Sequence, residues 1–414
     1  MERTYRQVTC KRDVTNANFT RGVIDVDFSI GGKTTWTPSK SYFRIGVELV
    51  GAGGNPPVVA DDIAFANFCP GNLFDNCFFY AGGQNVSSIV NYAPQAHALG
   101  YRLKKSGAWM NSIGKDAYGI NSNYDYRRRQ SSSDGNIVLA DVEKGVAKLG
   151  DSMNNRKVYF MYQPPLGIME HNKPMGSGDY RFQFNPNTNF KKSCVQSIVD
   201  DKTVATDFDF NVTSMELYIC TEKMDVSPTG TDVLHLMEHQ VQSKTVSAGE
   251  GNYDFTIPSS TKAISIFVQA GNAGSDNRLP PSNFTTTGGQ HLDLTSIQIT
   301  YAGITKPPTR WTSERSFLNG TEKLQQRYLD TQIESSQAFS PGGCEPFAEW
   351  KNNGPIYHYS WIRDANDRST QVQIQANFAA MNAGNNIFIV SHYTKSVEIS
   401  VENGFVAEVK SLTI

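Results

Sequence analysis

The sequence has no long apolar run and no apolar segment close to its first residue. A membrane-spanning helix needs about 20 consecutive apolar residues, and a secretory signal needs an apolar core behind its charged start. The opening residues, Met1-Glu-Arg-Thr-Tyr-Arg6, are polar and charged. We therefore expect neither a spanning helix nor a signal peptide, and we expect synthesis in the cytoplasm.

An excess of one charge is also lacking. The chain of 414 residues carries 38 Lys and Arg against 40 Asp and Glu, which gives a net charge of −2. Domains dedicated to nucleic acid usually have a clear basic excess, so the balance predicts no specific nucleic-acid partner. The length exceeds the roughly 250–300 residues at which one hydrophobic core stops growing. We therefore expect two domains.

The cysteines form no Cys-x-x-Cys pair. The six are scattered along the chain at Cys10, Cys69, Cys77, Cys194, Cys220 and Cys344. Without a signal peptide, this distribution predicts buried free thiols. A protein that does not meet the glycosylation machinery leaves its Asn-x-Ser/Thr sequons unmodified. We expect that of all five, Asn18, Asn85, Asn211, Asn283 and Asn319.

Two short motifs resemble catalytic or nucleotide-binding signatures but lack the required context. His235-Leu-Met-Glu-His239 matches the inverted zinc-protease pattern, with Glu314 as a possible third ligand. That site needs both histidines on one helix face, whereas the residues after His239 alternate as in a strand. Gly32-Lys33-Thr34 and Gly114-Lys115 lack the first glycine of a P-loop, where Asp27 and Trp109 stand instead.

The remaining charged clusters predict no chemistry either. Asp61-Asp62 and Asp200-Asp201 are adjacent pairs, so on a strand the two carboxylates face opposite ways. Arg127-Arg128-Arg129 beside Tyr124 and Tyr126 could bind phosphate or a charged partner, or form a solvated surface. No Gly-x-Ser-x-Gly elbow is present. We expect no catalytic, cofactor-binding or metal-binding residue, and no enzyme activity.

The chain is instead rich in turn residues and alternating apolar segments, with 34 Gly, 18 Pro and 11% aromatic residues. Strands are expected in two sets, separated by a linker at 222–231 with Pro228 and Gly230. The first set includes 23–30, 42–50, 72–80, 180–184 and 208–221. The second includes 239–246, 253–257, 263–269, 292–301, 356–361, 371–378, 386–392 and 396–401, with a turn at 305–308 after the strand 292–301.

Helices are expected within both sets, at 92–107, at 141–150 and at 322–334. The sequence therefore predicts an all-β chain of two antiparallel eight-stranded jelly-roll sandwiches in tandem, with short inserted helices. The division is an N-terminal arm at 1–20, a first jelly roll at 21–221, the linker at 222–231 and a second jelly roll at 232–414.

The segment 162–185 carries the clearest resemblance to a known family. It enters through Pro164-Pro165, continues with Leu166, Ile168 and Met169, and turns at Lys173-Pro174 into an alternating strand. This corner resembles one in the double jelly-roll major capsid proteins of tectiviruses, virophages, polinton-like viruses and adintoviruses, which are adenovirus-hexon-like. The stretches 67–86, 92–102, 297–308 and 324–328 are similar to other parts of these proteins, in the same order.

The resemblance implies a viral major capsid protein located in the virion. Such a protein assembles as pseudo-hexagonal homotrimers in an icosahedral shell of a DNA virus, with penton and minor capsid proteins as further partners. The loops 111–136 and 271–290 would form towers or clasps, and the arm could contact an internal membrane or the genome. Two alternatives stay open: a carbohydrate-binding or cell-attachment β-sandwich, and a glycan amidase-like enzyme on paired jelly rolls.

Overall fold

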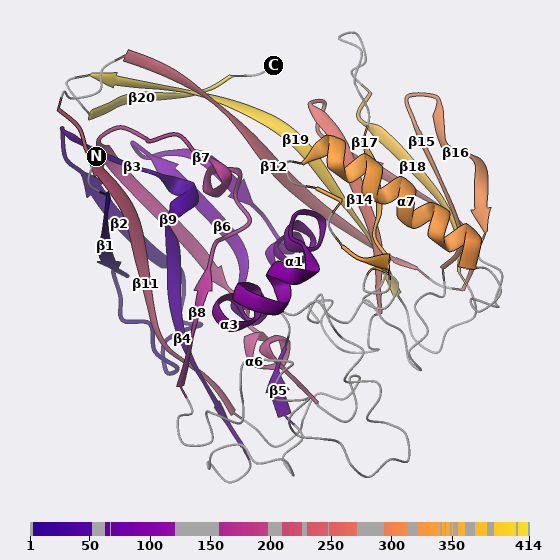
Figure 1. Cartoon of the computed structure of the whole chain (residues 1–414), viewed down its shortest axis with the longest axis horizontal. Coiled ribbons are helices and arrows are strands. Elements are labelled where there is room, and N and C mark those ends of the chain that lie inside the picture. The colour runs from indigo at the N-terminus through magenta and orange to yellow at the C-terminus, as the bar shows by residue number, and fades with distance from the viewer. Residues whose placement is uncertain are drawn as a thin grey trace.

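The computed structural model describes most of the chain. The described residues are 3–51, 63–66, 68–120, 157–197, 209–225, 230–246, 248–270, 294–312, 321–339, 342–343, 345–347, 350, 355–360, 369–378, 385–402 and 405–412. They form two β-sandwiches that lie side by side (Figure 1), in agreement with the predicted all-β fold. No helix in these ranges is long and apolar enough to cross a membrane.

The first sandwich consists of two antiparallel sheets. Sheet A has the order β1-β11-β4-β8, with β3 also paired to β11, and sheet B has the order β2-β9-β6-β7. A separate short pair joins β5 to β10. The strands are β1 Arg3–Thr9, β2 Ile24–Ile30, β3 Thr34–Trp36, β4 Tyr42–Val50, β5 Ile63–Phe65, β6 Phe74–Ala81, β7 Gln84–Ile89, β8 Lys157–Tyr162, β9 Gly178–Pro186, β10 Val195–Ser197 and β11 Asp209–Lys223.

The second sandwich repeats this arrangement strand for strand. Sheet C has the order β12-β19-β14-β17, with β20 also paired to β19, and sheet D has the order β13-β18-β15-β16. Each position in sheets A and B therefore has a counterpart in sheets C and D. The strands are β12 Gly230–Val246, β13 Gly249–Thr256, β14 Thr261–Ala270, β15 Leu294–Tyr301, β16 Ile304–Thr312, β17 Tyr357–Ser360, β18 Gln371–Phe378, β19 Asn385–Glu402 and β20 Phe405–Leu412.

Alternation of apolar residues explains why these segments pair as they do. In β4, Phe43, Ile45, Val47 and Leu49 are all at most 1% exposed, and they lie in one cluster with Phe182 of sheet B. Successive side chains on a strand point to opposite faces, so one face of sheet A meets sheet B across the sandwich. The ring of Phe43 contacts that of Phe182 edge-on, with centroids 5.2 Å apart.

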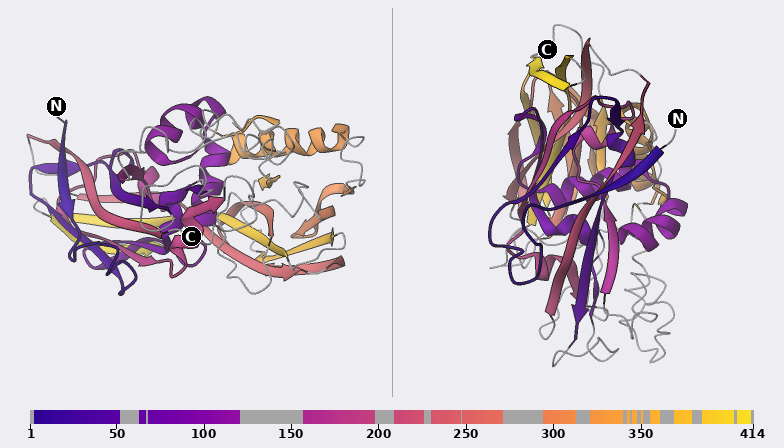
Figure 2. Two further views of the ribbon diagram at one scale, coloured as in Figure 1. Left: turned by 90° about the horizontal axis from the view of Figure 1, so that it is seen from below. Right: turned by 90° about the vertical axis from the view of Figure 1, so that its left-hand side faces the viewer.

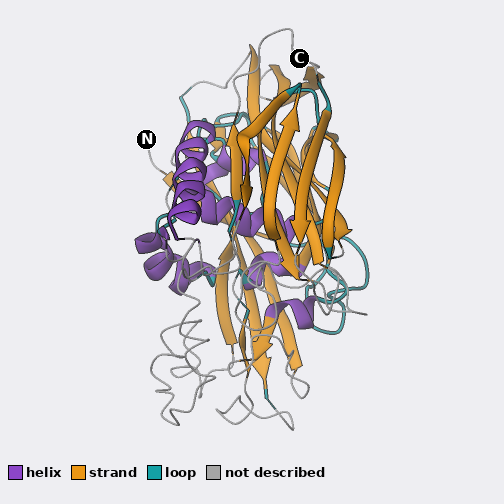
Figure 3. Ribbon diagram, turned by 90° about the vertical axis from the view of Figure 1, so that its right-hand side faces the viewer, coloured by secondary structure: helices purple, strands orange, loops and turns teal. Residues whose placement is uncertain are grey.

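The inserted helices occupy equivalent places in the two sandwiches. The first insertion follows β7, and the second follows β16. Pro94 stands in the first turn of the first helix, where a missing N–H costs nothing. The helical segments are α1 Ala93–Lys104, α2 Gly107–Trp109, η5 Met110–Gly114, α3 Lys115–Tyr118, α6 Phe190–Cys194 and α7 Thr321–Ala338, with 3-10 turns η1 Pro38–Lys40, η4 Cys69–Leu73 and η7 Gly167–Glu170. The helices lie along one side of the molecule (Figure 3).

Three strand predictions need correction. β12 begins at Gly230, nine residues before the expected start at His239, because it pairs along its whole length with β19. The two strands expected at 386–392 and 396–401 are one strand, β19, because β12 pairs with it without interruption through residues 393–395. The turn expected at 305–308 lies in β16, and the chain turns at Ala302-Gly303. β16 is an edge strand, where proline is tolerated.

The residues expected to form a separate N-terminal arm belong to the first sandwich. β1 is an edge strand of sheet A, and Val14 and Phe19 are buried in the core. The end of β11 at Lys223 and the start of β12 at Gly230 flank the expected linker. Much of the loop 111–136, together with the helix at 141–150 and the loop 271–290, lies outside the described residues. Residues 111–118 of that loop are helical turns.

Candidate functional site

Sheet C is buried on both faces, whereas sheet A is buried on one. In β19, Ile387 and Ile389 belong to the core of the second sandwich, whereas Phe388 and Val390 belong to the cluster that includes the first sandwich. Phe267 of β14 joins the same cluster as Phe388. The outer face of sheet C thus forms a joint between the two sandwiches. Several buried polar groups lie in this joint, among them Arg102, His239 and His392.

Helix α1 fills the joint. It lies between the two sandwiches in Figure 1, and nine of its residues are buried. The residue before it, Tyr92, places its ring edge-on to Phe388 with centroids 5.3 Å apart, and Ser243 of β12 donates to the Tyr92 hydroxyl at 2.8 Å. The Gln95 amide donates to Gln269 of β14 at 3.3 Å. The helix therefore contacts β12, β14 and β19 at once.

The far end of α1 carries a buried ion pair. Arg102 is 2% exposed and Glu345 is 3% exposed, and Nε and Nη2 of Arg102 donate to the two carboxylate oxygens at 3.0 and 3.1 Å. Such a two-point contact fixes both distance and orientation. Lys104 next to it pairs with Glu170 of η7 and lies 4.7 Å from the centre of the Phe339 ring.

A row of buried histidines lies on the outer face of sheet C. Nδ1 of His392 is 2.9 Å from Nδ1 of His239, and Nε2 of His392 is 2.8 Å from the Ser265 hydroxyl. The same hydroxyl is 2.8 Å from Nδ1 of His358. Phe339 covers the row, with its ring 5.0 Å from that of His392. The side chains of this row come from β12, β14, β17 and β19.

Burial keeps these histidines neutral. It lowers the pKa of His239 to about 4, with the Lys104 ammonium adding to the effect and Glu170 opposing it. Burial alone lowers the pKa of His358 to about 3. The pKa of His392 is lowered well below its ordinary value by burial and by the neighbouring His239, His358 and Lys104. Such a row holds strands together and is poorly placed to act on a substrate.

A buried carboxyl group lies on the opposite face of β12. Glu238 is 1% exposed, and it accepts hydrogen bonds from the Ser87 hydroxyl and from the Ser88 N–H at 3.2 Å. Burial raises the pKa of Glu238 to about 7, against the opposing effects of Ser87, Lys395 and backbone donors. The backbone of Gly167 lies so close to β12 that a Cβ there would be 2.6 Å from the Met237 carbonyl oxygen.

The Pro-Pro corner therefore packs in the joint. Leu166, Ile168 and Met169 are 2%, 0% and 4% exposed, and all three belong to the cluster shared by the two sandwiches. The turn η7 contacts β12 and β7. The corner contains no reactive side chain with a partner suited to catalysis, and its apolar residues are structural.

The zinc-protease motif does not form a site. His235 and His239 both lie in β12, where residues four apart are separated by about 13 Å along the strand. His235 contacts Ser396 at 2.8 Å, whereas His239 faces His392. Glu314 lies outside the described residues. No group of three or more His, Cys, Asp or Glu among the described residues could hold a metal ion.

The other candidate residues are also apart from one another. Lys33 lies between strands β2 and β3, so no helix follows it as a P-loop requires. Lys115 begins α3, which is four residues long. Asp61-Asp62, Arg127–Arg129 and Asp200-Asp201 lie outside the described residues. Of the cysteines, Cys69, Cys77, Cys194 and Cys220 are buried free thiols, and Cys10 is a half-buried one.

A shallow hollow of about 660 Å³ lies on the outer face of sheet B. Arg181 donates to Asp27 at 2.7 Å across it, and Tyr80 donates to Gln183 at 3.2 Å. Ser29 donates to Asp179 at 2.6 Å. These groups satisfy one another, and nothing among them favours a particular ligand.

Sequence reasoning missed the joint because its partners are far apart in the chain. Arg102 and Glu345 are separated by 243 residues, and His239 and His392 by 153. The available signal was the apolar content of β14 and β19 on both faces, since a sheet buried on both sides has near-continuous apolar strands. The run Ile387-Phe-Ile-Val390 has this character.

Solved structures of other proteins have the same arrangement of two sandwiches. No protein-family model matches the sequence, and no curated protein sequence matches it. The solved structure of the Sputnik virophage contains a chain with a TM-score of 0.63 at 11% identity, over 100% of this chain and 88% of that one. The crystal structure of the mavirus major capsid protein gives a TM-score of 0.57 at 12% identity, over 99% and 90%.

Identities this low bear on the fold alone. The match spans both sandwiches and nearly the whole length of either chain, so it concerns the tandem arrangement and not a single sandwich. Within this chain, the strand order of sheets A and B is repeated in sheets C and D, which agrees with this structural match. The chain has the double jelly-roll fold of these virophage proteins.

Proposed function

We propose that this protein is a viral major capsid protein that self-associates as a homotrimer and builds an icosahedral shell. The observation that carries the proposal is the strand-for-strand repeat of two jelly rolls joined by α1 into one body. Two equivalent units in one chain allow three chains to present six similar units around an axis. The likeness to the mavirus major capsid protein supports this role.

Several finer features belong to the same proposal. The protein would be made in the host cytoplasm without a signal peptide and would reside in the virion, with penton and minor capsid proteins as its other partners. Exposed basic side chains of β1, such as Arg6, would contact an internal membrane or the genome. The buried Arg102–Glu345 ion pair and the hydrogen-bonded His239 and His392 support a structural role and not an enzymatic one.

Light scattering combined with negative-stain microscopy tests the proposal. A trimer of a 45.8 kDa chain has a mass of about 137 kDa, three times the chain mass. Purified protein at micromolar concentration and physiological salt should have this mass and should appear as pseudo-hexagonal particles. A monomer under these conditions would contradict the proposal. Binding to an immobilised glycan array by the monomer would favour a cell-attachment protein instead.

A further inference from the structure

Because the strand order is repeated, each surface of the first sandwich corresponds to a surface of the second. Sheet A (β1-β11-β4-β8) corresponds to sheet C (β12-β19-β14-β17), and α1 corresponds to α7 because each is inserted between equivalent strands. In the left view of Figure 2, α1 and α7 lie on the same side of the molecule, one beside each sandwich. Contacts made by one member of each pair can therefore be compared with those of the other.

Within the chain, α1 covers the outer face of sheet C. That face carries a stacked pair of rings from its two central strands, Phe267 of β14 and Phe388 of β19, with centroids 5.1 Å apart and planes 6° from parallel. Both rings are 0% exposed. Tyr92 at the start of α1 caps the pair by its edge-on contact with Phe388. The two sandwiches are thus joined by the packing of a helix on a sheet.

The corresponding face of sheet A stays open at Tyr5 and Tyr159, although α3 contacts its edge strand β8. It too carries a stacked pair from its two central strands, Tyr42 of β4 and Tyr218 of β11, with centroids 5.4 Å apart and planes 9° from parallel. Arg44 lies over the rings of Tyr218 and Tyr159, at 5.2 and 5.1 Å. Tyr5 and Tyr159 are 56% and 52% exposed. The right view of Figure 2 looks onto this sheet.

The outward face of α7 is open to solvent, and its most exposed described residues are uncharged; Asp330 beside them is 33% exposed and is paired with Arg327 and Gln326 of the same helix. Leu329 and Ile333, one helical turn apart, are 45% and 57% exposed. Their exposed neighbours on the helix are all neutral and polar: Gln325, Gln326, Ser336 and Gln337. A helix facing only solvent normally carries charged residues on that side. Burial of this face would leave the Asp330 carboxylate with its ion pair to Arg327 and its hydrogen bond from Gln326.

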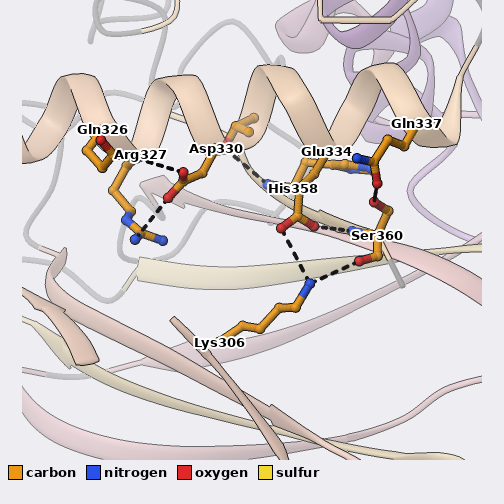
Figure 4. A network of polar contacts seen from close by, with 9 residues as sticks. Lys306, Gln326, Arg327, Asp330, Glu334, Gln337, His358 and Ser360 are labelled. Carbon is orange, nitrogen blue, oxygen red and sulfur yellow. Dashed lines mark hydrogen bonds and ion pairs between the residues drawn. The ribbon is translucent and has the colours of Figure 1, made fainter. Parts of the chain in front are cut away.

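The charged residues of α7 are held by neighbours of their own chain. Glu334 accepts from the Ser360 N–H at 2.6 Å and pairs with Lys306 at 3.5 Å, as Figure 4 shows. Arg327 pairs with Asp330 at 3.0 Å. The contacts of Glu334 hold the inner side of α7 on its own sandwich, the Arg327–Asp330 pair lies within the helix, and Leu329 and Ile333 are left outward.

We propose that α7 of one copy packs on the outer face of sheet A of a second copy, in the way that α1 packs on sheet C within one chain. Leu329 and Ile333 would lie against the tyrosines of this face, Tyr5, Tyr42, Tyr159 and Tyr218. Tyrosine and arginine are enriched at the centre of protein interfaces. Two different surfaces of one chain then meet head to tail, an arrangement that forms a ring when the rotation between copies closes and an open filament when it does not. The inference rests on the proposed self-association and specifies its contact surface.

Two variants test this interface, each altering one side of it. Leu329→Glu/Ile333→Glu places charge on the helix, and Tyr5→Glu/Tyr159→Glu places charge on the sheet. Each variant alone should run as a folded monomer of 45.8 kDa, because the new carboxylates would be buried against apolar groups. Val23→Glu is the matched control, since Val23 is 43% exposed and lies just before β2 of sheet B, outside both surfaces, and it should stay trimeric.

Mixing the two variants gives the sharpest result. One intact helix face and one intact sheet face remain in the mixture, so the two chains should form a 1:1 dimer of about 92 kDa, twice the chain mass, and no trimer. A bismaleimide should also join Ile333→Cys/Tyr159→Cys chains into a covalent trimer on a denaturing gel. The cross-linking experiment adds no charge, so it avoids any loss of folding that added charge would cause.

The outcomes separate this inference from the proposed function. Variants that remain trimeric, or a trimeric double-cysteine protein that does not cross-link, would overturn the α7–sheet A contact while self-association stood. Folded variants that stay monomeric after mixing would also overturn it. A wild-type protein that is itself monomeric would overturn the proposed function, and this inference with it.

Discussion

Arg102 and Glu345 form a two-point ion pair that joins the two sandwiches from the inside. Arg102 lies on α1 of the first sandwich and Glu345 lies between α7 and β17 of the second, and both are nearly inaccessible to solvent. Because two charges in such a place are stable only as a pair, the contact requires both halves of the chain to be folded and docked. The joint is therefore part of the folded core.

Removing one partner of this pair should destabilise the whole protein. We expect Glu345→Gln or Arg102→Met to lower the free energy of unfolding by about 3–5 kcal/mol, because the remaining charge would be buried alone. The double variant Arg102→Met/Glu345→Met should recover much of this loss. Chemical denaturation measures all three. Additive losses in the double variant would show that the pair is not coupled.

Glu238 should make stability fall as the pH rises. Its folded pKa of about 7 lies above the ordinary value of 4.5, so the contribution is fully present below about pH 4.5 and is lost as the pH passes 7. The loss amounts to roughly 3 kcal/mol at most, from about 1.4 kcal/mol for each pKa unit. Denaturation of Glu238→Gln at pH 5 and pH 8 should show a smaller difference than wild type. An equal difference would mean that Glu238 is ionised at both pH values.

The histidine row should act in the opposite direction. Burial lowers the folded pKa of His358 to about 3, so below the unfolded value of about 6.5 only the unfolded chain takes up this proton. Stability should then fall as the pH drops from 7 to 5, by roughly 2 kcal/mol for this residue. His358→Gln should flatten the dependence whatever its effect at pH 7. A slope identical to wild type would place the acid sensitivity elsewhere.

The Pro-Pro corner offers a matched pair of substitutions. Ile168 is 0% exposed, and Ile168→Ala should lower the free energy of unfolding by about 2–5 kcal/mol and reduce the yield of trimer. Glu170, two residues along, has a half-exposed side chain paired with Lys104, so Glu170→Gln should cost about 1 kcal/mol or less. Thermal unfolding distinguishes the two. A folded Glu170→Gln protein that lost a measurable activity would identify the corner as an active-site loop.

Deleting the first 18 residues should destabilise the first sandwich. The deletion removes β1 from the edge of sheet A, with the ion pair between Arg3 and Glu222, and removes Val14 from the core. Circular dichroism should show a lower melting temperature. An unchanged melting temperature together with impaired shell assembly would instead support a separate arm.

The sequence by itself determined the local structure. The alternation of Phe43, Ile45, Val47 and Leu49 was enough to predict β4 with its buried face, and Pro94 marked the first turn of α1. These signals are local, because the periodicity of apolar residues in a strand or helix is apparent within a few residues. From two sets of such strands the two-sandwich architecture followed.

Only the tertiary structure decided which surfaces meet. Sheet C is buried on both faces and sheet A on one, although their strand orders are the same. The break expected between residues 392 and 396 of β19 is spanned because β12 pairs with β19 through it. Arg102 finds Glu345, and His239 finds His392, across 243 and 153 residues. Period and composition describe a segment's own faces, whereas its partner depends on how the whole chain packs.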